Sequence, residues 1–269
     1  MSKVRIASWN VKHFKGEPSR VNRVVDFLDH HKPDIFTLIE VTSADVFKAL
    51  TEKMPGYHFH ITDGPQVQEL LVGVKRTVEG AYFSQRTEFK SGNSKLRPGA
   101  LLTFKKQTKI YTVLFLHAKS MTDPKGLGLR DDQFDKIRRL KKRLDEKAGG
   151  KGKANLVVIG DLNTMGMKYP YNQSISAETE LRKLDRLIAG KTVQMRRLSK
   201  SHSLTYASQS LSLQSDLDHV LVSNQLNVKT SSGHEVRVFG WPEESTDSAK
   251  KRWIKSFSDH ALLRVDIDV

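Results

Sequence analysis

The sequence of 269 residues contains no cysteine. Disulfide bonds, thiolate metal sites and cysteine nucleophiles are therefore excluded, and any metal would take oxygen and nitrogen ligands, which suit Mg²⁺, Mn²⁺ or Ca²⁺. Long hydrophobic runs are also missing, because no stretch reaches the ~18 to 20 apolar residues of a membrane span. The opening segment MSKVRIASWN has no apolar signal region. We therefore expect a cytoplasmic protein, or a secreted or periplasmic one if a leader has been removed.

Acidic residues are outnumbered, with 45 Lys and Arg against 30 Asp and Glu and a net charge of +15. A surplus of this size favours a polyanionic partner, with nucleic acid, and DNA above all, ahead of an anionic membrane. A basic protein without such a partner is the alternative. The chain has no repeat, low-complexity tract or linker. We expect a single domain over residues 1–269 that works as a monomer.

Hydrophobic patterning predicts the secondary structure. Alternating and β-branched residues predict strands over residues 3–10, 34–40, 57–64, 69–76, 80–86, 99–106, 109–117, 155–161, 216–223, 234–240 and 260–269. Helical spacing predicts helices over 19–31, 43–53, 127–150 and 177–190, the first capped by Ser19 and stopped by Pro33. Connections of both hairpin and helix length indicate an α/β fold, a two-layer β-sandwich of mixed sheets flanked by helices.

Polar residues with chemical potential stand at the ends of these strands. Asp161 and Asn163 follow the apolar run VVIG, and in an extended chain they would share one face. Gly, Asp and Asn are also ordinary turn residues, so a simple turn is the alternative. The remaining strand ends carry Asn10, Glu40, His117, Asp218, Asp259 and His260. Each has an ordinary structural explanation when taken alone, but the set predicts a site at one edge of the sheets.

Five short motifs together point to a known family. SWN, LIEV, GDLNT, LDHVLVS and SDH, in this order, resemble motifs of the endonuclease/exonuclease/phosphatase superfamily, which includes deoxyribonuclease I, abasic-site endonucleases, sphingomyelinases and inositol polyphosphate phosphatases. The resemblance runs from Asn10 to His260 and is specific as a set, whereas SDH alone is weak. It implies a deoxyribonuclease I-like sandwich with the active site at one edge, and a metal-dependent phosphodiester hydrolase.

The resemblance also implies a metal site. Glu40 would hold a divalent cation, Mg²⁺ or Mn²⁺, with Asn10 close by and Asp259 beside the metal. A hard cation with oxygen ligands fits this set. Lys12 stands where many members of the family have an aspartate. This departure favours one metal over two, although a lysine there could instead contact the substrate.

Catalytic roles follow from the same resemblance. His260 would act with Asp218, which would orient its ring and stabilise its charged form. Asp161 and Asn163 would face the scissile phosphate. His117 resembles the histidine of deoxyribonuclease I and the sphingomyelinases, and it would contact phosphate or assist the leaving group.

Basic residues suggest where a substrate lies. Arg97, in LRPGALLTF, resembles a deoxyribonuclease arginine that grips a phosphate, a task for which its planar fork is suited. In SAKKRWIKSFSDH, Lys251 and Arg252 flank Trp253, and such a mixture is typical of a loop that grips a nucleic-acid strand. The alternative is that Trp253 packs inward among solubilising lysines. Lys119 would extend the same channel.

Three functions remain open. The first is a metal-dependent nuclease that cuts within DNA strands, with RNA as a further substrate. The second is a hydrolase of the same superfamily acting on a phospholipid or a small phosphoester. The third is a non-catalytic relative that binds nucleic acid. The positive charge and the complete set of strand-end residues favour the first.

Overall fold

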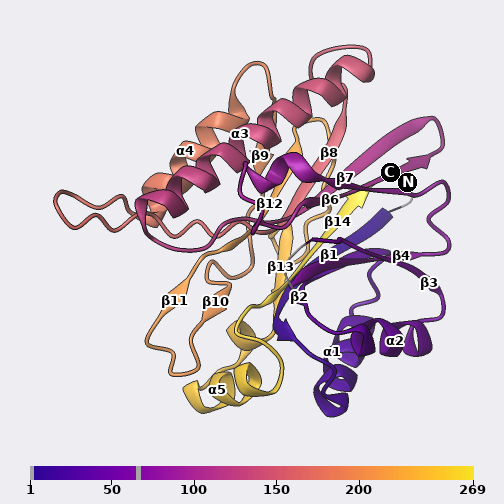
Figure 1. Ribbon diagram of the computed structural model, residues 1–269. Helices are drawn as coiled ribbons and strands as arrows, with labels where there is room; N and C mark the ends of the chain where they lie inside the picture. The colour runs from indigo at the N-terminus through magenta and orange to yellow at the C-terminus, as the bar shows by residue number, and fades with distance from the viewer. Residues whose placement is uncertain (1–2, 65–67) are drawn as a thin grey trace.

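Two mixed sheets form the centre of the molecule (Figure 1). The computed structural model describes residues 3–64 and 68–269. One six-stranded sheet has the order β13 (Val236–Phe239), β14 (Leu262–Asp268), β1 (Lys3–Phe14), β2 (Ile35–Val41), β4 (Glu69–Lys75) and β3 (Tyr57–Ile61). The other has the order β5 (Tyr82–Arg86), β6 (Gly99–Lys106), β7 (Lys109–His117), β8 (Asn155–Asp161), β12 (Asp218–Ser223) and β9 (Met195–Arg197). A separate ribbon pairs β10 (Tyr206–Ala207) with β11 (Gln214–Ser215). The predicted fold class is confirmed.

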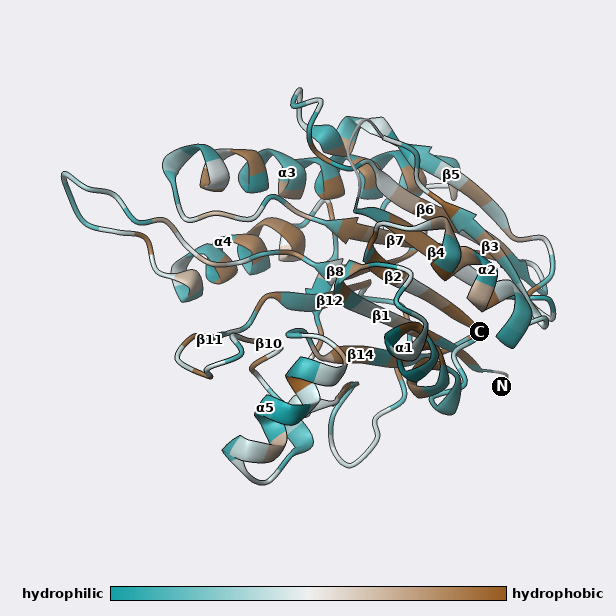
Figure 2. Ribbon diagram, turned by 60° about the horizontal axis from the view of Figure 1, so that its bottom comes forward, coloured by the Kyte–Doolittle hydropathy of each residue, from teal (hydrophilic) through white to brown (hydrophobic). Residues whose placement is uncertain are grey.

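Helices lie outside the two sheets. On the side of the first sheet are α1 (Pro18–His30), α2 (Ala44–Lys53) and α5 (Asp247–Ser256), and on the side of the second are α3 (Pro124–Lys147) and α4 (Ala177–Ala189). Two short 3₁₀ helices, η1 (Thr87–Lys90) and η2 (Trp241–Glu243), complete the elements. Figure 2 shows hydrophobic strands in the interior and helices with largely hydrophilic outer surfaces. Among the described residues, no helix is long and apolar enough to cross a membrane.

The central strands of the second sheet are buried on both faces. Val113 and Phe115 of β7 belong to the core between the sheets, whereas Leu114 and Leu116 pack in a second cluster with residues of α3 and α4. Side chains of a strand alternate between faces, so a strand covered on both sides must be apolar throughout. This explains the uninterrupted hydrophobic runs in the sequence.

Strand directions bring the predicted polar residues to one edge. β1 and β2 are parallel, as are β7 and β8, so each pair ends at the same place, and His117 stands beside Asp161. β12 is antiparallel to β8 and begins at this edge, with Asp218 opposite Asp161. β14 is antiparallel to β1 and begins two residues after His260. Polar groups from residue 10 to residue 260 therefore meet.

Three local predictions are wrong. The cap of the first helix is Glu17 rather than Ser19, because Pro18 occupies the first turn, where its missing N–H is not needed. The third helix begins at Pro124, three residues before the predicted start, with Asp123 as its cap. Residues 247–256 form helix α5 instead of a loop, and Thr246 caps it by accepting a hydrogen bond from the Ala249 N–H at 3.2 Å.

Candidate active site

A cavity of about 660 Å³ lies at the edge where the strands end. Eight of the predicted site residues line it: Glu40, Arg97, His117, Lys119, Asp161, Asn163, Asp259 and His260. Asn10 and Asp218 lie behind the wall, where they hydrogen-bond to lining residues. The structure therefore brings ten of the thirteen predicted residues together.

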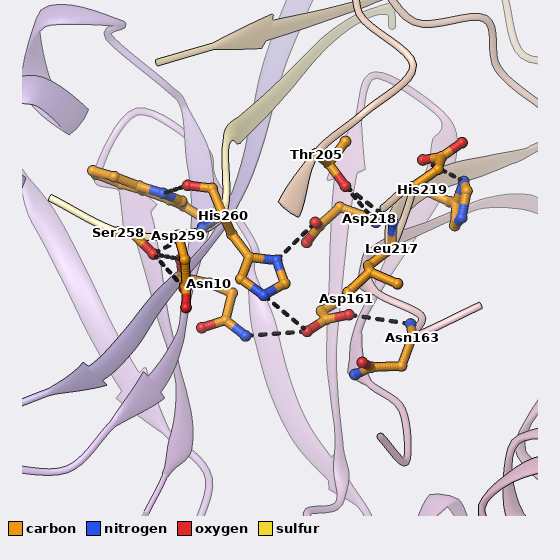
Figure 3. A network of polar contacts seen from close by, with 12 residues as sticks. Asn10, Asp161, Asn163, Thr205, Leu217, Asp218, His219, Ser258, Asp259 and His260 are labelled. Carbon is orange, nitrogen blue, oxygen red and sulfur yellow. Dashed lines mark hydrogen bonds and ion pairs between the residues drawn. The ribbon is translucent and has the colours of Figure 1, made fainter. Parts of the chain in front are cut away.

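His260 is held between two carboxylates (Figure 3). Its Nδ1 atom lies 2.9 Å from Oδ2 of Asp218, and its Nε2 atom lies 3.8 Å from Oδ2 of Asp161. The start of β12 is positioned by the Thr205 hydroxyl, which accepts hydrogen bonds from the N–H groups of Leu217 and Asp218 at 3.1 and 3.0 Å. His260 and Asp218, which we call the dyad, are buried, and so is Asp161, the carboxylate that faces them. The ring of His260 therefore has a fixed orientation.

Burial and neighbouring charges set the protonation states of His260, Asp161 and His117. Burial disfavours the charged form of His260, but the negative charges of Asp218 and Asp161 outweigh it and raise the pKa of His260 to about 10. Burial raises the pKa of Asp161 to about 7. Burial lowers the pKa of His117 to about 4. At neutral pH, the site thus holds an imidazolium at His260 and a neutral imidazole at His117.

The amide of Asn10 joins the two carboxylates that line the cavity. Its Nδ2 atom donates to Oε1 of Glu40 at 3.2 Å and to Oδ2 of Asp161 at 3.1 Å. Glu40 also accepts a hydrogen bond from the His13 N–H at 2.9 Å. Burial opposes the ionisation of Glu40, but the nearby His117 and these two hydrogen bonds lower its pKa overall. Glu40 therefore remains a carboxylate that faces the cavity.

The backbone of Glu40 adopts a left-handed conformation, with φ at 69°. A non-glycine residue in this region carries a steric cost of about 1 to 3 kcal/mol, and such residues gather at functional sites. β2 pairs with β4 irregularly at this point, between Ile39 and Val41. The irregularity lets the carboxylate turn out of the sheet toward the cavity.

Asp161 and Asn163 reach the cavity through a turn rather than through an extended strand. β8 ends at Asp161, and Asn163 has a left-handed φ of 52°. The Asn163 N–H donates to Oδ1 of Asp161 at 3.1 Å, and its side-chain amide donates to the Ala118 carbonyl at 3.1 Å. The alternative of a turn is thus the correct description of the backbone, and both side chains still line the same cavity.

Lys12 and Asp259 form an ion pair across the cavity wall. Nζ of Lys12 lies 2.9 Å from Oδ2 of Asp259. The neighbouring Ser258 hydroxyl donates to the Asn10 carbonyl at 2.7 Å, which ties the segment that carries Asp259 and His260 to β1. An ammonium therefore occupies the space beside this carboxylate.

The donor atoms of the site suit a hard cation. Ligand atoms of Asp161, Asp218 and His260 all lie within 4.8 Å of one another. Asp218 and His260 already share a hydrogen bond, whereas Asp161 of this group and the nearby Glu40 both line the cavity and offer carboxylate oxygens to it. Carboxylate and amide oxygens are the ligands preferred by Mg²⁺ and Mn²⁺, and the site fits such an ion.

The segment predicted to be a strand-gripping loop forms helix α5 instead. Trp253 is only 8% exposed and packs against Trp9, Phe27 and Phe257, with ring centroids 5.9, 5.9 and 5.0 Å away. It is not available to stack on a base, so its predicted role is wrong, and the alternative of an inward-facing ring is right. Helical periodicity turns Lys251 and Arg252 outward, where they are exposed and do not line the cavity.

Several residues that line the cavity were not predicted. Loops contribute Lys95, Met121 and Leu213, the first turn of α3 contributes Lys125, and β10 contributes Tyr206. Behind Asp218, the buried Lys200 pairs with Asp216 and donates to the Asp218 carbonyl at 2.8 Å. These residues follow no strand-end pattern; Met121, Lys125 and Lys200 lie in the segments HAKSMTDPKG and KTVQMRRLSK, whose charges suggest an extension of the substrate channel, but the sequence singles out none of them.

Comparisons with known proteins agree with this geometry. The profile of the "Endonuclease/Exonuclease/phosphatase family" matches residues 7–260. Humanized D. rerio TDP2 carrying 14 mutations is 13% identical, with a TM-score of 0.69 over 99% of both chains. D. rerio TDP2 complexed with single strand DNA product is 13% identical, with a TM-score of 0.67 over 100% of both chains. An endonuclease/exonuclease/phosphatase from Bacteroides vulgatus is 16% identical, with a TM-score of 0.66 over 100% of both chains.

At these identities, the solved structures share the fold with this chain. No curated protein sequence matches it significantly. The family profile, however, spans the strand-end residues from Asn10 to His260 that build the cavity. The chain therefore belongs to the endonuclease/exonuclease/phosphatase family.

Proposed function

We propose that the protein is a nuclease that depends on Mg²⁺ or Mn²⁺ and hydrolyses phosphodiester bonds within DNA strands. The observation that carries the proposal is the position of His260, 2.9 Å from Asp218 and 3.8 Å from Asp161, on the wall of an open cavity. Phosphodiester hydrolysis needs an activated water, stabilisation of phosphoryl oxygens and help for the leaving oxygen. A charged histidine that faces a carboxylate of near-neutral pKa supports the first two tasks.

Each side chain has a distinct part in this proposal. Asp161 accepts the proton of the attacking water, and the Asn163 beside it helps to position that water. The Nε2–H of His260 holds a phosphoryl oxygen, while Asp218 fixes the ring through Nδ1. His117, neutral at physiological pH, has its Nε2 atom 3.7 Å from Oδ2 of Asp161, and from there it contacts the phosphate or the leaving oxygen.

For the metal, we propose a single cation held by Glu40, with Asn10 close by. When bound, the cation would neutralise charge on the phosphoryl oxygens. Asp259 was expected beside the metal, but the ammonium of Lys12 lies 2.9 Å from it. A carboxylate paired in this way is a weaker ligand for a second cation, which supports one metal rather than two.

Cations around the cavity support a nucleic-acid substrate. The side chains of Lys12, Lys95, Arg97, Lys119 and Lys125 line it. These charges match a phosphate backbone, which is the main source of affinity in nucleic-acid binding. Arg97 is already partly oriented, because its Nε donates to the Gln68 carbonyl at 3.1 Å. The D. rerio TDP2 structure with a DNA product supports the same substrate class.

A phospholipid or small phosphoester is the second candidate substrate. Leu213 is 55% exposed at the ribbon of β10 and β11, and it lines the cavity together with Tyr206. An apolar or aromatic group of the substrate, next to its phosphate, would contact these two side chains. The serine-rich segment between the two strands and the positive charge favour nucleic acid over a lipid surface.

A cleavage assay tests the proposal. Supercoiled plasmid, linear duplex, single-stranded DNA and RNA are each incubated with purified protein in Mg²⁺, Mn²⁺ or EDTA. We expect metal-dependent nicking of the closed circle, a loss of about 10² to 10⁴-fold in His260→Ala, and full activity in His30→Ala, whose side chain is exposed on α1. Glu40→Ala should raise the metal concentration needed.

The other outcomes separate the remaining functions. Tight binding without cleavage of any nucleic acid would contradict the proposal and favour a non-catalytic relative. Neither binding nor cleavage would turn attention to phospholipids and small phosphoesters. Equal activity in His260→Ala and His30→Ala would show that the dyad does not carry the reaction.

A further inference from the structure

Residues 167–175 form a projecting arm that directly follows the Asp161–Asn163 turn. Met167 and Ile175 close its base as an antiparallel bridge, with N–H to carbonyl distances of 2.8 and 2.9 Å. The seven residues between them, 168–174, are all exposed. Figure 1 shows the arm extending past α3 and α4 at the left of the molecule. The arm begins only a few residues after the side chains that line the cavity.

A buried ion pair fixes the base of the arm. Arg130 is fully buried, and its guanidinium contacts Glu180 at 2.6 Å while it donates to the carbonyls of Gly166 and Met121 at 2.7 Å each. The Gly166 N–H donates to the same Glu180 at 2.7 Å. Gly166 has a φ of 72°, and a Cβ there would lie 2.2 Å from the Ile175 carbonyl oxygen, so only glycine fits.

The same contacts join the arm to the cavity wall. Met165 and Met121, which flank these bonds, both line the cavity. The Lys168 N–H donates to the Thr122 carbonyl at 2.7 Å, which adds a second tie to the segment that follows His117. The base of the arm is therefore held in a fixed place relative to Asp161, although its tip is open to solvent.

The tip presents aromatic rings and positive charge. Tyr171 is 87% exposed and Tyr169 is 41% exposed, with ring centroids 5.8 Å apart in an edge-to-face arrangement. Residues 165–176 include Lys168 and no acidic residue, and Lys119 and Lys125 lie on the adjoining cavity wall. Exposed rings beside cations are the elements with which proteins hold single strands.

We propose that the arm binds an unpaired stretch of the nucleic-acid substrate, with the ring of Tyr171 stacked on a base. The inference rests on the proposed function and specifies the kind of strand that extends from the cavity. Bases in a duplex have both faces covered by their neighbours, so a protruding ring can stack only where bases are unpaired.

The length of the arm limits where the contact falls. Tyr171 lies four positions after Met167, which corresponds to at most ~13 Å of extended chain. This span equals about four nucleotides at ~3.4 Å each. The stacked base therefore lies within about four nucleotides of the base of the arm.

Two variants and a matched control test the arm. Tyr171→Ala removes the ring, Tyr171→Trp keeps an aromatic surface, and Tyr82→Ala removes a tyrosine that is 70% exposed on the edge strand β5 and does not line the cavity. Affinity for single-stranded DNA of about 12 nucleotides, well beyond the arm's reach, is measured by fluorescence anisotropy in EDTA. Turnover of this oligonucleotide is compared with turnover of the p-nitrophenyl ester of thymidine monophosphate.

We expect Tyr171→Ala to weaken oligonucleotide binding by at least about 5-fold, Tyr171→Trp to restore it, and Tyr82→Ala to leave it unchanged. The loss of kcat/KM in Tyr171→Ala should be greater for the oligonucleotide than for the mononucleotide ester by a similar factor. Duplex DNA without ends should show no dependence on the ring.

The outcomes distinguish this inference from the proposed function. If the wild-type protein cleaves nothing but its oligonucleotide affinity depends on Tyr171, the nuclease proposal is wrong and the arm's role stands. If Tyr171→Ala binds as tightly as Tyr82→Ala, the inference is overturned whatever the catalytic result. It is also overturned if the wild-type protein binds no single strand, and the rings would then face a protein or a membrane.

Discussion

Nζ of Lys12 lies 2.9 Å from Oδ2 of Asp259, at the wall of the cavity that also holds Glu40 and His260. The side chain of Lys12 remains 47% exposed, so its ammonium retains donors that can reach a phosphate. A lysine is a permanent part of the chain, whereas a bound cation dissociates. The protein therefore has a fixed positive charge next to the site proposed for its single metal.

Removing this charge should weaken binding in a way that depends on salt. In Lys12→Met, we expect the slope of log affinity against log salt for single-stranded DNA to become shallower by about 0.7, because one fewer counterion is released. Anisotropy titrations at several salt concentrations measure this slope. Lys255→Met, on the exposed face of α5, is the control. An equal change in both variants would mean that Lys12 has no special contact with the strand.

The hydrogen bond between Asp218 and His260 should control both rate and protonation. Asp218→Asn removes the negative charge that raises the pKa of His260, so that pKa should fall and kcat should drop by about 10² to 10⁴-fold. A pH–rate profile, together with NMR titration of the His260 ring, measures the two effects. Asp185→Asn breaks an ion pair with Arg197 outside the cavity and should change neither.

Stability of the metal-free protein should fall at alkaline pH. The pKa of His260 is about 10 in the folded protein, above its ordinary value of 6.5, so the folded state binds this proton more tightly. The resulting stabilisation is complete below pH ~6.5 and is lost as the pH rises through about 10. Urea unfolding in EDTA between these limits should show the decline in the wild-type protein and in His30→Gln, but not in His260→Gln. A decline of equal size in all three proteins would mean that a group other than His260 causes it.

Lys200 should be important for stability because its side chain is only 4% exposed. Lys200→Met leaves the partly buried Asp216 without its partner and removes the donor to the Asp218 carbonyl, which should lower the free energy of unfolding by about 3 kcal/mol. In Lys183→Met, an exposed pair with Asp131 is broken, and the loss should stay below about 1 kcal/mol. Equal losses in the two variants would show that the buried Lys200–Asp216 pair stabilises the protein no more than the exposed Lys183–Asp131 pair does. Restoration in Lys200→Met/Asp216→Asn would confirm that the unpaired carboxylate causes the loss.

The central part of the fold was predictable because its physical signals are local. β7 and β8 read as uninterrupted apolar runs since both of their faces are buried, and their observed bounds match the predicted ones. Most polar site residues were predictable as well, because they stand close to the beginning or the end of such a strand, although β1 continues past Asn10 to Phe14. The number of domains and the monomeric state remain predictions.

The rest of the site depends on contacts between distant parts of the chain. The sequence shows that residue 12 is a lysine, but its pairing with Asp259 arises only when β14 joins β1. Around Trp253, basic residues on both sides of a ring fit a loop and a helix equally well, and only packing against Trp9 and Phe27 decides between them. Runs of charged residues can also contain a buried one that the sequence does not distinguish, such as Lys141, which pairs with Asp145 inside α3.

The pairing of β14 with β1, from Lys3 opposite Asp268 to Ser8 opposite Leu263, has a consequence for the newly made protein. The ribosome releases Asn10 early, yet the histidine of the dyad arrives with the last strand of the sheet. Contacts so distant in sequence form late and slowly. A nascent chain that ends before residue 260 would therefore carry Glu40, Asp161 and Asp218 but lack the proposed catalytic histidine, and proteolytic removal of β14 would leave His260 in the chain without the pairing to β1 that holds this segment in place.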